Sequence, residues 1–294
     1  MGRALYDAVP AAREIFEQAD EALGSKLSSL CFDGPDEELR LTANTQPAIL
    51  AASIAALKAL EQHDLAADFV AGHSLGEYSA LVAAGSLSFG DAVVTVRKRG
   101  LFMQEAVPAG EGAMAALIGA SPEVVSAICL EAQELGTCSP ANLNSPSQTV
   151  IAGHRSAIEK AAEIAKKRGA KRAVMLAVSA PFHCELMSPA AARLQPVLEE
   201  ISFADLRIPL VTNVDAAFIT SGKEAKQSLL RQVASPVRWS ESVRLMLDSG
   251  VTTFVEVGPG KVLSGLIRQI DRDCTVLNVE DAQSLDATVA ALER

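Results

Sequence analysis

The sequence predicts an α/β protein in which a large α/β-hydrolase-like domain, residues 1–111 and 179–294, carries an inserted ferredoxin-like subdomain at 112–178. Two observations predict this arrangement. A Gly-x-Ser-x-Gly motif stands between a short apolar strand and a helix, as in the nucleophile elbow of α/β-hydrolase folds. In the middle of the chain the elements follow the order β-α-β-β-α-β, which is typical of the ferredoxin-like fold. The length of 294 residues is sufficient for one large domain or two.

Composition and charge exclude several classes of protein. Apolar residues make up 49% of the chain and charged residues 21%, which is typical of a well-buried core and excludes a disordered chain. The net charge of −10 leaves no general positive face for nucleic acid or a membrane surface. The five cysteines form no Cys-x-x-Cys pair, so we expect neither a disulfide framework nor a metal site. The start of the chain lacks the features of a signal peptide, and we expect a cytoplasmic protein.

The first third of the chain reads as helices around one short strand. Apolar residues at helical spacing predict a helix over 5–19. Charged and turn-forming residues predict a turn at 33–40. An Ala-rich helix is expected over 47–62, with its proline in the first turn, where proline is tolerated. A buried strand at 68–72 leads directly into a helix, and a further helix covers 88–107.

The inserted subdomain is predicted from six elements in sequence. Its strands are expected at 113–119, 137–142, 149–152 and 172–178, and its helices at 121–134 and 156–168. A Ser-Pro pair begins the first of these helices, and a glycine follows the second. The chain then returns to the large domain with a strand at 208–212, helices at 224–234 and 237–248, a strand at 252–257 and a last helix from Lys261.

The elbow motif makes Ser74 the candidate nucleophile. Its residues are Gly72-His73-Ser74-Leu75-Gly76. So tight a turn is expected to admit only glycine on both flanks, and it raises the serine hydroxyl above the sheet. The helix that follows points its free N–H groups at the serine, and the N–H of Leu75 is expected to stabilise an oxyanion.

A nucleophilic serine needs a base, and the chain has four histidines. His63 at a helix end and His154 at the edge of the insertion are expected on the surface. His73 lies inside the elbow, where its direction suits a supporting role. His183 lies in a non-helical loop where the chain returns from the insertion, and we expect it to reach Ser74 as the general base.

Arg99 falls within the apolar stripe of the helix over 88–107, whereas Lys98 points away from that stripe. A guanidinium that faces the core must be paired, because an unpaired buried charge costs several kcal/mol. Its partner is either a structural carboxylate or the carboxylate of a substrate. The pattern itself leaves both possibilities open.

Five motifs in this order resemble the malonyl-CoA:acyl carrier protein transacylase family over essentially the whole chain. They are Gly72-His73-Ser74-Leu75-Gly76-Glu77-Tyr78-Ser79-Ala80-Leu81, Arg97-Lys98-Arg99-Gly100, Asn142-Leu143-Asn144-Ser145-Pro146, Ala180-Pro181-Phe182-His183 and Glu256-Val257-Gly258-Pro259-Gly260-Lys261. The resemblance implies ping-pong transfer of a malonyl group from malonyl-CoA to the phosphopantetheine thiol of acyl carrier protein. It implies no cofactor, since the CoA thioester is a substrate.

The resemblance also implies roles for individual residues. Ser74 would carry the malonyl group and His183 would move the proton, with Arg99 holding the malonyl carboxylate. The family has no triad carboxylate, and the backbone carbonyl of Gln232 would orient the histidine. Two further matches are Phe182, whose bulk would exclude an α-methyl branch, and Asn144, which matches a residue near the active site.

The family also begins with a strand and a Gly-Gln-Gly-Ser-Gln loop that supplies a second oxyanion N–H, and this sequence starts just after that point. A chain without that donor is expected to turn over on the order of 100- to 1000-fold more slowly.

Two other functions remain open from the residues. A serine hydrolase would need an acidic residue between Ser74 and His183, and candidates such as Glu123 and Glu159 fall within the insertion. A non-catalytic scaffold is the second alternative. The expected carrier is acidic, so this chain must offer it a local basic surface. The densest basic cluster, which we call the basic patch, comprises Lys166, Lys167, Arg168, Lys171 and Arg172. The favoured interpretation is that it complements the dipole at the end of the predicted helix, and docking of the carrier is the alternative hypothesis.

Overall fold

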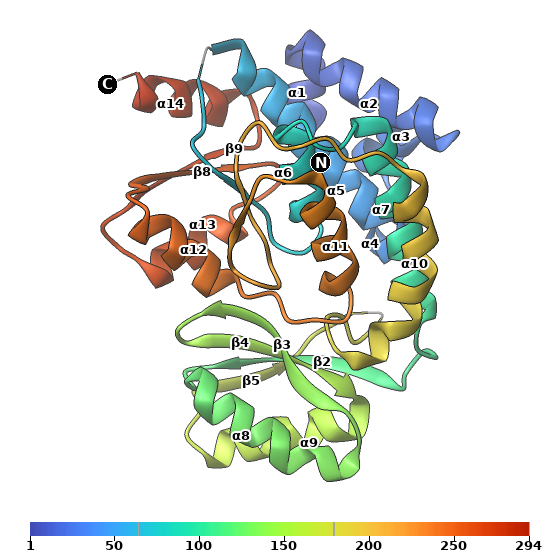
Figure 1. The fold of residues 1–294 in the computed structure, drawn as a ribbon, viewed down its shortest axis with the longest axis vertical. Helices are drawn as coiled ribbons and strands as arrows, with labels where there is room; N and C mark the ends of the chain where they lie inside the picture. The colour runs from blue at the N-terminus through green and yellow to red at the C-terminus, as the bar shows by residue number, and fades with distance from the viewer. Residues whose placement is uncertain (64, 179, 294) are drawn as a thin grey trace.

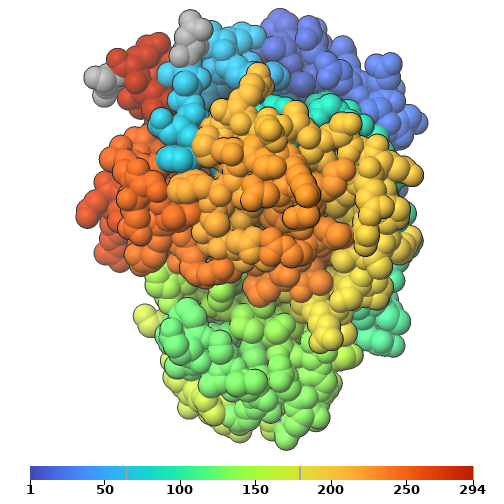
Figure 2. All heavy atoms as spheres, viewed as in Figure 1, coloured from blue at the N-terminus to red at the C-terminus, as the bar shows by residue number. Residues whose placement is uncertain are grey.

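The computed structural model describes residues 1–63, 65–178 and 180–293. They form a large lobe, built from both ends of the chain, and a small lobe built from its middle (Figures 1 and 2). The sheet of the small lobe lies between its own two helices and the large lobe (Figure 1). This is the α/β class, with an inserted ferredoxin-like unit, that the sequence predicts.

Five helices precede the first strand: α1 (Arg3–Ala8), α2 (Pro10–Leu23), α3 (Leu27–Asp33), α4 (Asp36–Arg40) and α5 (Thr42–Leu60). The single helix predicted at 5–19 is wrong, because the backbone of Val9 is extended and Pro10 begins a new helix. The turn predicted at 33–40 contains α4. Helix α5 begins five residues earlier than expected, so Pro47 lies inside it and withholds one backbone N–H from the helix.

The strands of the large lobe form two small sheets. Strand β1 (Val70–Ala71), shorter than predicted, pairs in parallel with β6 (Leu210–Val211), which pairs antiparallel with β7 (Phe218–Ile219). Strands β8 (Thr253–Val257) and β9 (Thr275–Val279) form a separate parallel pair. Because β1 and β6 are parallel, the loops that follow them leave the sheet at the same edge.

The remaining helices of the large lobe are α6 (Gly76–Ala83), α7 (Phe89–Glu105), α10 (Ser188–Glu200), α11 (Gly222–Gln232), α12 (Trp239–Asp248), α13 (Val262–Ile270) and α14 (Ala282–Leu292). Sequence reasoning missed α3, α10, α14, β7 and β9 and took α13 as the last element. Helix α10 contains Pro196, a residue that argues against a helix, and it is nevertheless held by three buried side chains, Ala190, Leu194 and Leu198.

The small lobe contains β2 (Gly112–Ile118), α8 (Pro122–Ala132), β3 (Cys138–Ser145), β4 (Gln148–His154), α9 (Arg155–Lys167) and β5 (Arg172–Met175). Its strand order is β3-β4-β2-β5 with antiparallel neighbours, which is the ferredoxin-like topology. Residues of β2, β3 and β4 belong to two separate apolar clusters, whereas β5 is mostly exposed. The predicted limit between 178 and 179 falls beside Ser179, which lies outside the described residues, and the exact domain limits stay a prediction.

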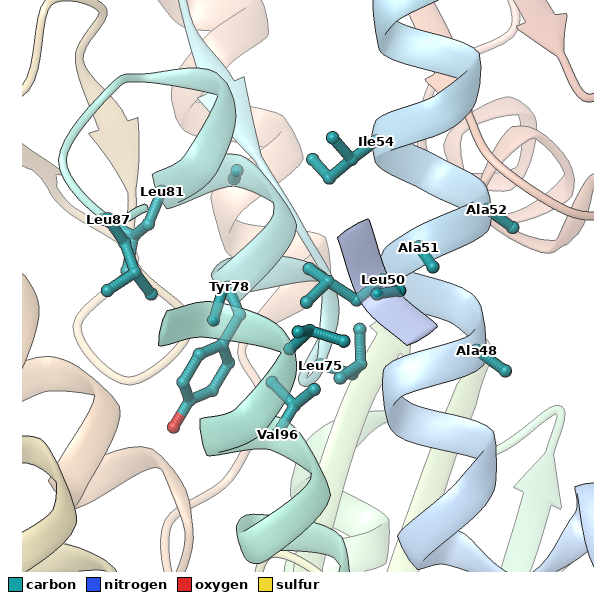
Figure 3. Packing of buried hydrophobic residues seen from close by; sticks show 14 of the residues in the cluster. Ala48, Leu50, Ala51, Ala52, Ile54, Leu75, Tyr78, Leu81, Leu87 and Val96 are labelled. Atoms are coloured by element: carbon teal, nitrogen blue, oxygen red, sulfur yellow. The ribbon is translucent and has the colours of Figure 1, made fainter. Parts of the chain in front are cut away.

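The core of the large lobe is built around α5, whose residues are mostly buried. In Figure 3 the side chains of Leu50 and Ile54 point from α5 toward α6 and α7, where Leu75 and Val96 lie. Small alanines elsewhere on α5 let neighbouring helices approach closely. This packing places the start of α6 and the middle of α7 side by side in the core.

No helix formed by the described residues is both long enough and apolar enough to cross a membrane.

Candidate active site

The elbow between β1 and α6 holds Ser74 in a strained backbone conformation with φ 52°. A Cβ added to Gly72 would lie 2.0 Å from the backbone of Gly76, so only glycine fits there. At Gly76 itself nothing lies within 4 Å of an added Cβ. The expectation that both flanks require glycine is therefore correct for the first flank and wrong for the second.

The loop after the small lobe brings His183 onto the serine. The Oγ of Ser74 lies 2.7 Å from Nε2 of His183, and Nδ1 of His183 lies 2.9 Å from the backbone carbonyl oxygen of Gln232. A carbonyl only accepts, so Nδ1 carries the proton and Nε2 is free to accept the serine proton. Burial, reinforced by the positive charge of Arg99, lowers the pKa of His183 to about 3.

Arg99 lies in the core on α7 and is only 2% exposed. Its Nη1 donates to Oε1 of Gln46 at 2.7 Å, and its Nη2 donates to Oε1 of Gln232 at 2.9 Å and to Oγ of Ser74 at 3.1 Å. Within the described residues its Nε has no acceptor, and no carboxylate forms an ion pair with it. A structural carboxylate, one of the two partners left open by the sequence, is thus not in contact with Arg99. Burial lowers the pKa of Arg99.

The backbone N–H of Leu75 stands at the start of α6 next to the serine. It makes no hydrogen bond to any described residue, whereas the N–H of Ser74 is held at 2.7 Å by Oδ1 of Asn213. The free N–H at the positive end of a helix is suited to an oxyanion. The site therefore brings together a hydroxyl in contact with a buried imidazole, a free backbone N–H at the start of a helix and a buried guanidinium.

The structure also places the other residues that the sequence analysis named. Nε2 of His73 bonds Oδ1 of Asn144 at 2.9 Å, which connects the elbow to β3 of the small lobe. Burial lowers the pKa of His73. Phe182 is partly buried beside the proposed base and packs against both lobes. His63 is exposed, but His154 is half-buried and its Nδ1 accepts the N–H of Thr137 at 2.9 Å.

Sequence reasoning missed three residues that complete the site: Gln46, Glu77 and Asn213. Oδ1 of Asn213 accepts the N–H of Ser74, and its Nδ2 donates to the carbonyl oxygen of Gly72 at 2.7 Å. This amide therefore holds both sides of the strained turn. In the sequence, Asn213 directly follows the strand predicted at 208–212, which could have indicated a role near the site. The sequence does not show that this strand pairs with β1.

Glu77, on the first turn of α6, is fully buried. Its carboxylate accepts from Nε2 of Gln232 at 2.8 Å, from the N–H of Asn213 at 3.0 Å and from Oγ of Ser228 at 3.0 Å. Burial raises its pKa, while these donors act in the opposite direction. In the sequence, Glu77 is a charged residue followed by small and apolar ones. That pattern does not indicate which groups its carboxylate would hold.

In the part of the chain that the structure describes, no group of three or more His, Cys, Asp or Glu side chains could hold a metal ion.

Known proteins are similar to this chain over almost its whole length. A family model described as acyl transferase domain matches residues 1–288. A malonyl CoA-acyl carrier protein transacylase of Bacillus subtilis is 51% identical over 294 residues, which cover 100% of this chain and 93% of that protein.

Solved structures are similar over the same extent. That of a malonyl CoA-acyl carrier protein transacylase from Coxiella burnetii has a TM-score of 0.98 at 42% identity and covers 100% of this chain and 93% of that one. A type II PKS acyl-carrier protein in complex with its malonyl-transacylase gives a TM-score of 0.96 at 44% identity, covering 99% and 94%.

Proposed function

The chain belongs to the acyl transferase family and within it to the malonyl-CoA:acyl carrier protein transacylases, and from this membership we propose how its site works. The enzyme transfers the malonyl group of malonyl-CoA to the phosphopantetheine thiol of acyl carrier protein, for fatty acid synthesis. The proposed route is ping-pong, through a malonyl ester on Ser74. No cofactor takes part in this route, since CoA enters as the thioester substrate.

In the first half-reaction, Nε2 of His183 accepts the proton of the Ser74 hydroxyl while Oγ attacks the thioester carbonyl carbon. The N–H of Leu75 donates to the oxyanion of the tetrahedral intermediate. When the C–S bond breaks, the CoA thiolate takes the proton back from His183. The 2.7 Å contact between Oγ and Nε2 supports this step.

In the second half-reaction the carrier thiol occupies the place of CoA. His183 accepts the thiol proton, the sulfur attacks the ester carbonyl, and the Ser74 oxygen leaves with that proton. The backbone carbonyl of Gln232 keeps the imidazole in the tautomer that both steps require. No acidic side chain is needed for this orientation, which argues against the serine hydrolase with a triad carboxylate.

The observation that best supports malonyl as the transferred acyl group is the contact of 3.1 Å between Nη2 of Arg99 and Oγ of Ser74. In a malonyl thioester a single methylene separates the carboxylate from the carbonyl under attack, so a cation that recognises the carboxylate must lie beside the nucleophile. Among the described residues Nε of Arg99 has no acceptor, and we propose this buried N–H as a donor to that carboxylate. Phe182, next to the base, is proposed to limit the space for an α-methyl branch.

Intact-protein mass spectrometry after mixing with malonyl-CoA tests this function, with Ser74→Ala as the control. We expect a malonyl adduct on the natural chain, none on the variant, and loss of the adduct when carrier protein with its phosphopantetheine arm is added. Absence of any adduct on the natural chain would contradict the proposal. A cytoplasmic location is proposed with it, because both the CoA thioester and the carrier belong to fatty acid synthesis.

A further inference from the structure

Every group that the Arg99 guanidinium contacts is electrically neutral. Its acceptors are the amide oxygens of Gln46 and Gln232 and the hydroxyl of Ser74, at 2.7, 2.9 and 3.1 Å. A cation this deeply buried is normally in contact with a carboxylate, because the low dielectric of the interior penalises an uncompensated charge. The neutral surroundings of Arg99 therefore need an explanation.

Among the described residues, the only buried acidic side chain is that of Glu77, one amide away from Arg99. Burial raises its pKa, but three hydrogen-bond donors stabilise its ionised form. Glu77 and Arg99 form no ion pair, yet Nε2 of Gln232 donates to the Glu77 carboxylate at 2.8 Å while Oε1 of the same amide accepts from Arg99 at 2.9 Å. The charge of Glu77 raises the pKa of Arg99, against the larger effect of burial. Glu77 thus supports the cation without touching it.

The orientation of the Gln232 amide follows from its neighbours. Its Nε2 faces three oxygen acceptors: the ionised Glu77 carboxylate, the backbone carbonyl of Ser74 at 3.0 Å and, at 3.4 Å, the amide oxygen of Asn213. Its Oε1 must therefore face Arg99. A flipped amide would set oxygen against oxygen on one side and N–H against N–H on the other.

We propose that Gln232 is a specificity-determining spacer: it separates the buried counter-charge of Glu77 from Arg99, so that the only carboxylate able to contact the guanidinium is that of the acyl group. This rests on the proposed function and extends it. A carboxylate of the protein in direct contact would occupy the donors that the substrate needs. A remote one stabilises the cation in the free enzyme and leaves its donors available.

The test moves the counter-charge into contact without changing side-chain size. Gln46→Glu places a carboxylate on Nη1 of Arg99 and sacrifices only a weak contact of the Gln46 amide with Sδ of Met103 at 3.8 Å. Glu77→Gln removes the remote charge and can keep its hydrogen bonds, because the Ser228 hydroxyl can accept as well as donate. The double variant keeps one buried carboxylate and changes only its place.

The measured quantity is the ratio of the initial rates at which malonyl-CoA and acetyl-CoA acylate Ser74, followed by intact-protein mass spectrometry. Gln46→Glu and the double variant are expected to lower this ratio by roughly 10- to 100-fold, the worth of one charge-assisted hydrogen bond. Glu77→Gln is expected to keep or raise it, since the substrate carboxylate remains the only contacting counter-charge.

Two results would overturn the inference: an unchanged ratio in Gln46→Glu, or a fall of the same size in Glu77→Gln as in the double variant. Acylation by acetyl-CoA and the melting temperature report whether each variant is folded. Should Gln46→Glu fail to fold, the ratio in Glu77→Gln alone decides. A natural chain that forms no malonyl adduct would instead contradict the proposed function, so the two failures are distinguishable.

Discussion

At the scale of single residues, burial keeps the proposed base uncharged. His183 is 3% exposed, and burial together with the charge of Arg99 lowers its pKa from 6.5 to about 3. The neutral form accepts the serine proton, so protonation abolishes catalysis, and a lowered pKa extends activity toward acid. We expect the kcat/KM for malonyl-CoA to stay level down to about pH 5. An acid limb near the ordinary histidine pKa of 6.5 would contradict this.

The guanidinium of Arg99 should discriminate between acyl groups rather than accelerate all of them. Arg99→Ala removes a cation that contacts Ser74, so acylation by malonyl-CoA should fall by roughly 10- to 100-fold more than acylation by acetyl-CoA. Competing the two thioesters in one reaction measures the ratio directly. Equal losses for both would refute a role in carboxylate recognition.

Sequence motifs located Ser74, His183 and Arg99, because each belongs to a pattern with a chemical reason: a tight turn, a returning loop, a charge in an apolar stripe. Asn213 and Gln46 were missed for a physical reason. Single amides carry no pattern of their own, and their contacts with Arg99 and Ser74 join residues that are at least 53 positions apart in the sequence. Tertiary packing decides that the amide of Gln46 contacts Arg99 and that the amide of Asn213 contacts the backbone of Ser74.

At the scale of elements, the elbow makes opposite demands on its two glycines. Gly72→Ala would place a Cβ 2.0 Å from the backbone of Gly76, so we expect loss of the folded elbow and of acylation. Gly76→Ala meets no atom within 4 Å and lies on α6, where alanine favours the helix by about 0.5–1 kcal/mol. Melting temperatures and Ser74 acylation compare the pair; similar behaviour of both variants would contradict the geometry.

Helices and strands were predicted where periodicity is strong and missed where tertiary contacts replace it. The elements of the small lobe agree with the sequence within a few residues, because β2 and β4 are short buried runs and Ser121 caps the first helix. Helix α10 contains Pro196, and β9 is partly exposed, so neither has a pattern that local reasoning recognises. Helix α10 is stabilised by its contacts with α7 and α11, and β9 by pairing with β8.

At the scale of the whole molecule, the carrier is expected to be acidic and this chain has a net charge of −10, so docking requires a local basic surface on this chain. In the basic patch, Lys166 and Lys167 lie in the last turn of α9, and Arg168 is paired with Glu131. If the patch helps docking, Lys167→Glu with Lys171→Glu should raise the KM for the carrier at low salt. The same charge change at Lys98 and Lys223 on the large lobe is the control. Equal effects of both pairs, or none, would exclude a docking role.

The sheet of the small lobe also contacts the large lobe. One of its faces packs against the helices of the small lobe, and the other packs against the loop that contains His183. Along β2, Ala113, Ala115 and Leu117 pack against α8 and α9, whereas Met114 and Ala116 join Cys184 and Phe182 on the opposite face. Those last two residues flank His183. The sheet thus supports the loop that carries the base, and an added Cβ at Gly112 would lie 2.4 Å from Pro181 in the same loop.

This arrangement predicts that truncations on the two faces of one strand differ in their effect on catalysis. Met114→Ala and Leu117→Ala remove buried side chains, 3% and 0% exposed, and each should destabilise the fold by about 2–5 kcal/mol. Only Met114→Ala leaves space beneath the 182–184 loop, so His183 becomes better solvated and its pKa rises toward 6.5. We expect the acid limb of kcat/KM to move to higher pH in Met114→Ala and to stay in place in Leu117→Ala. Identical pH profiles at equal loss of stability would show that the small lobe does not set the environment of the base.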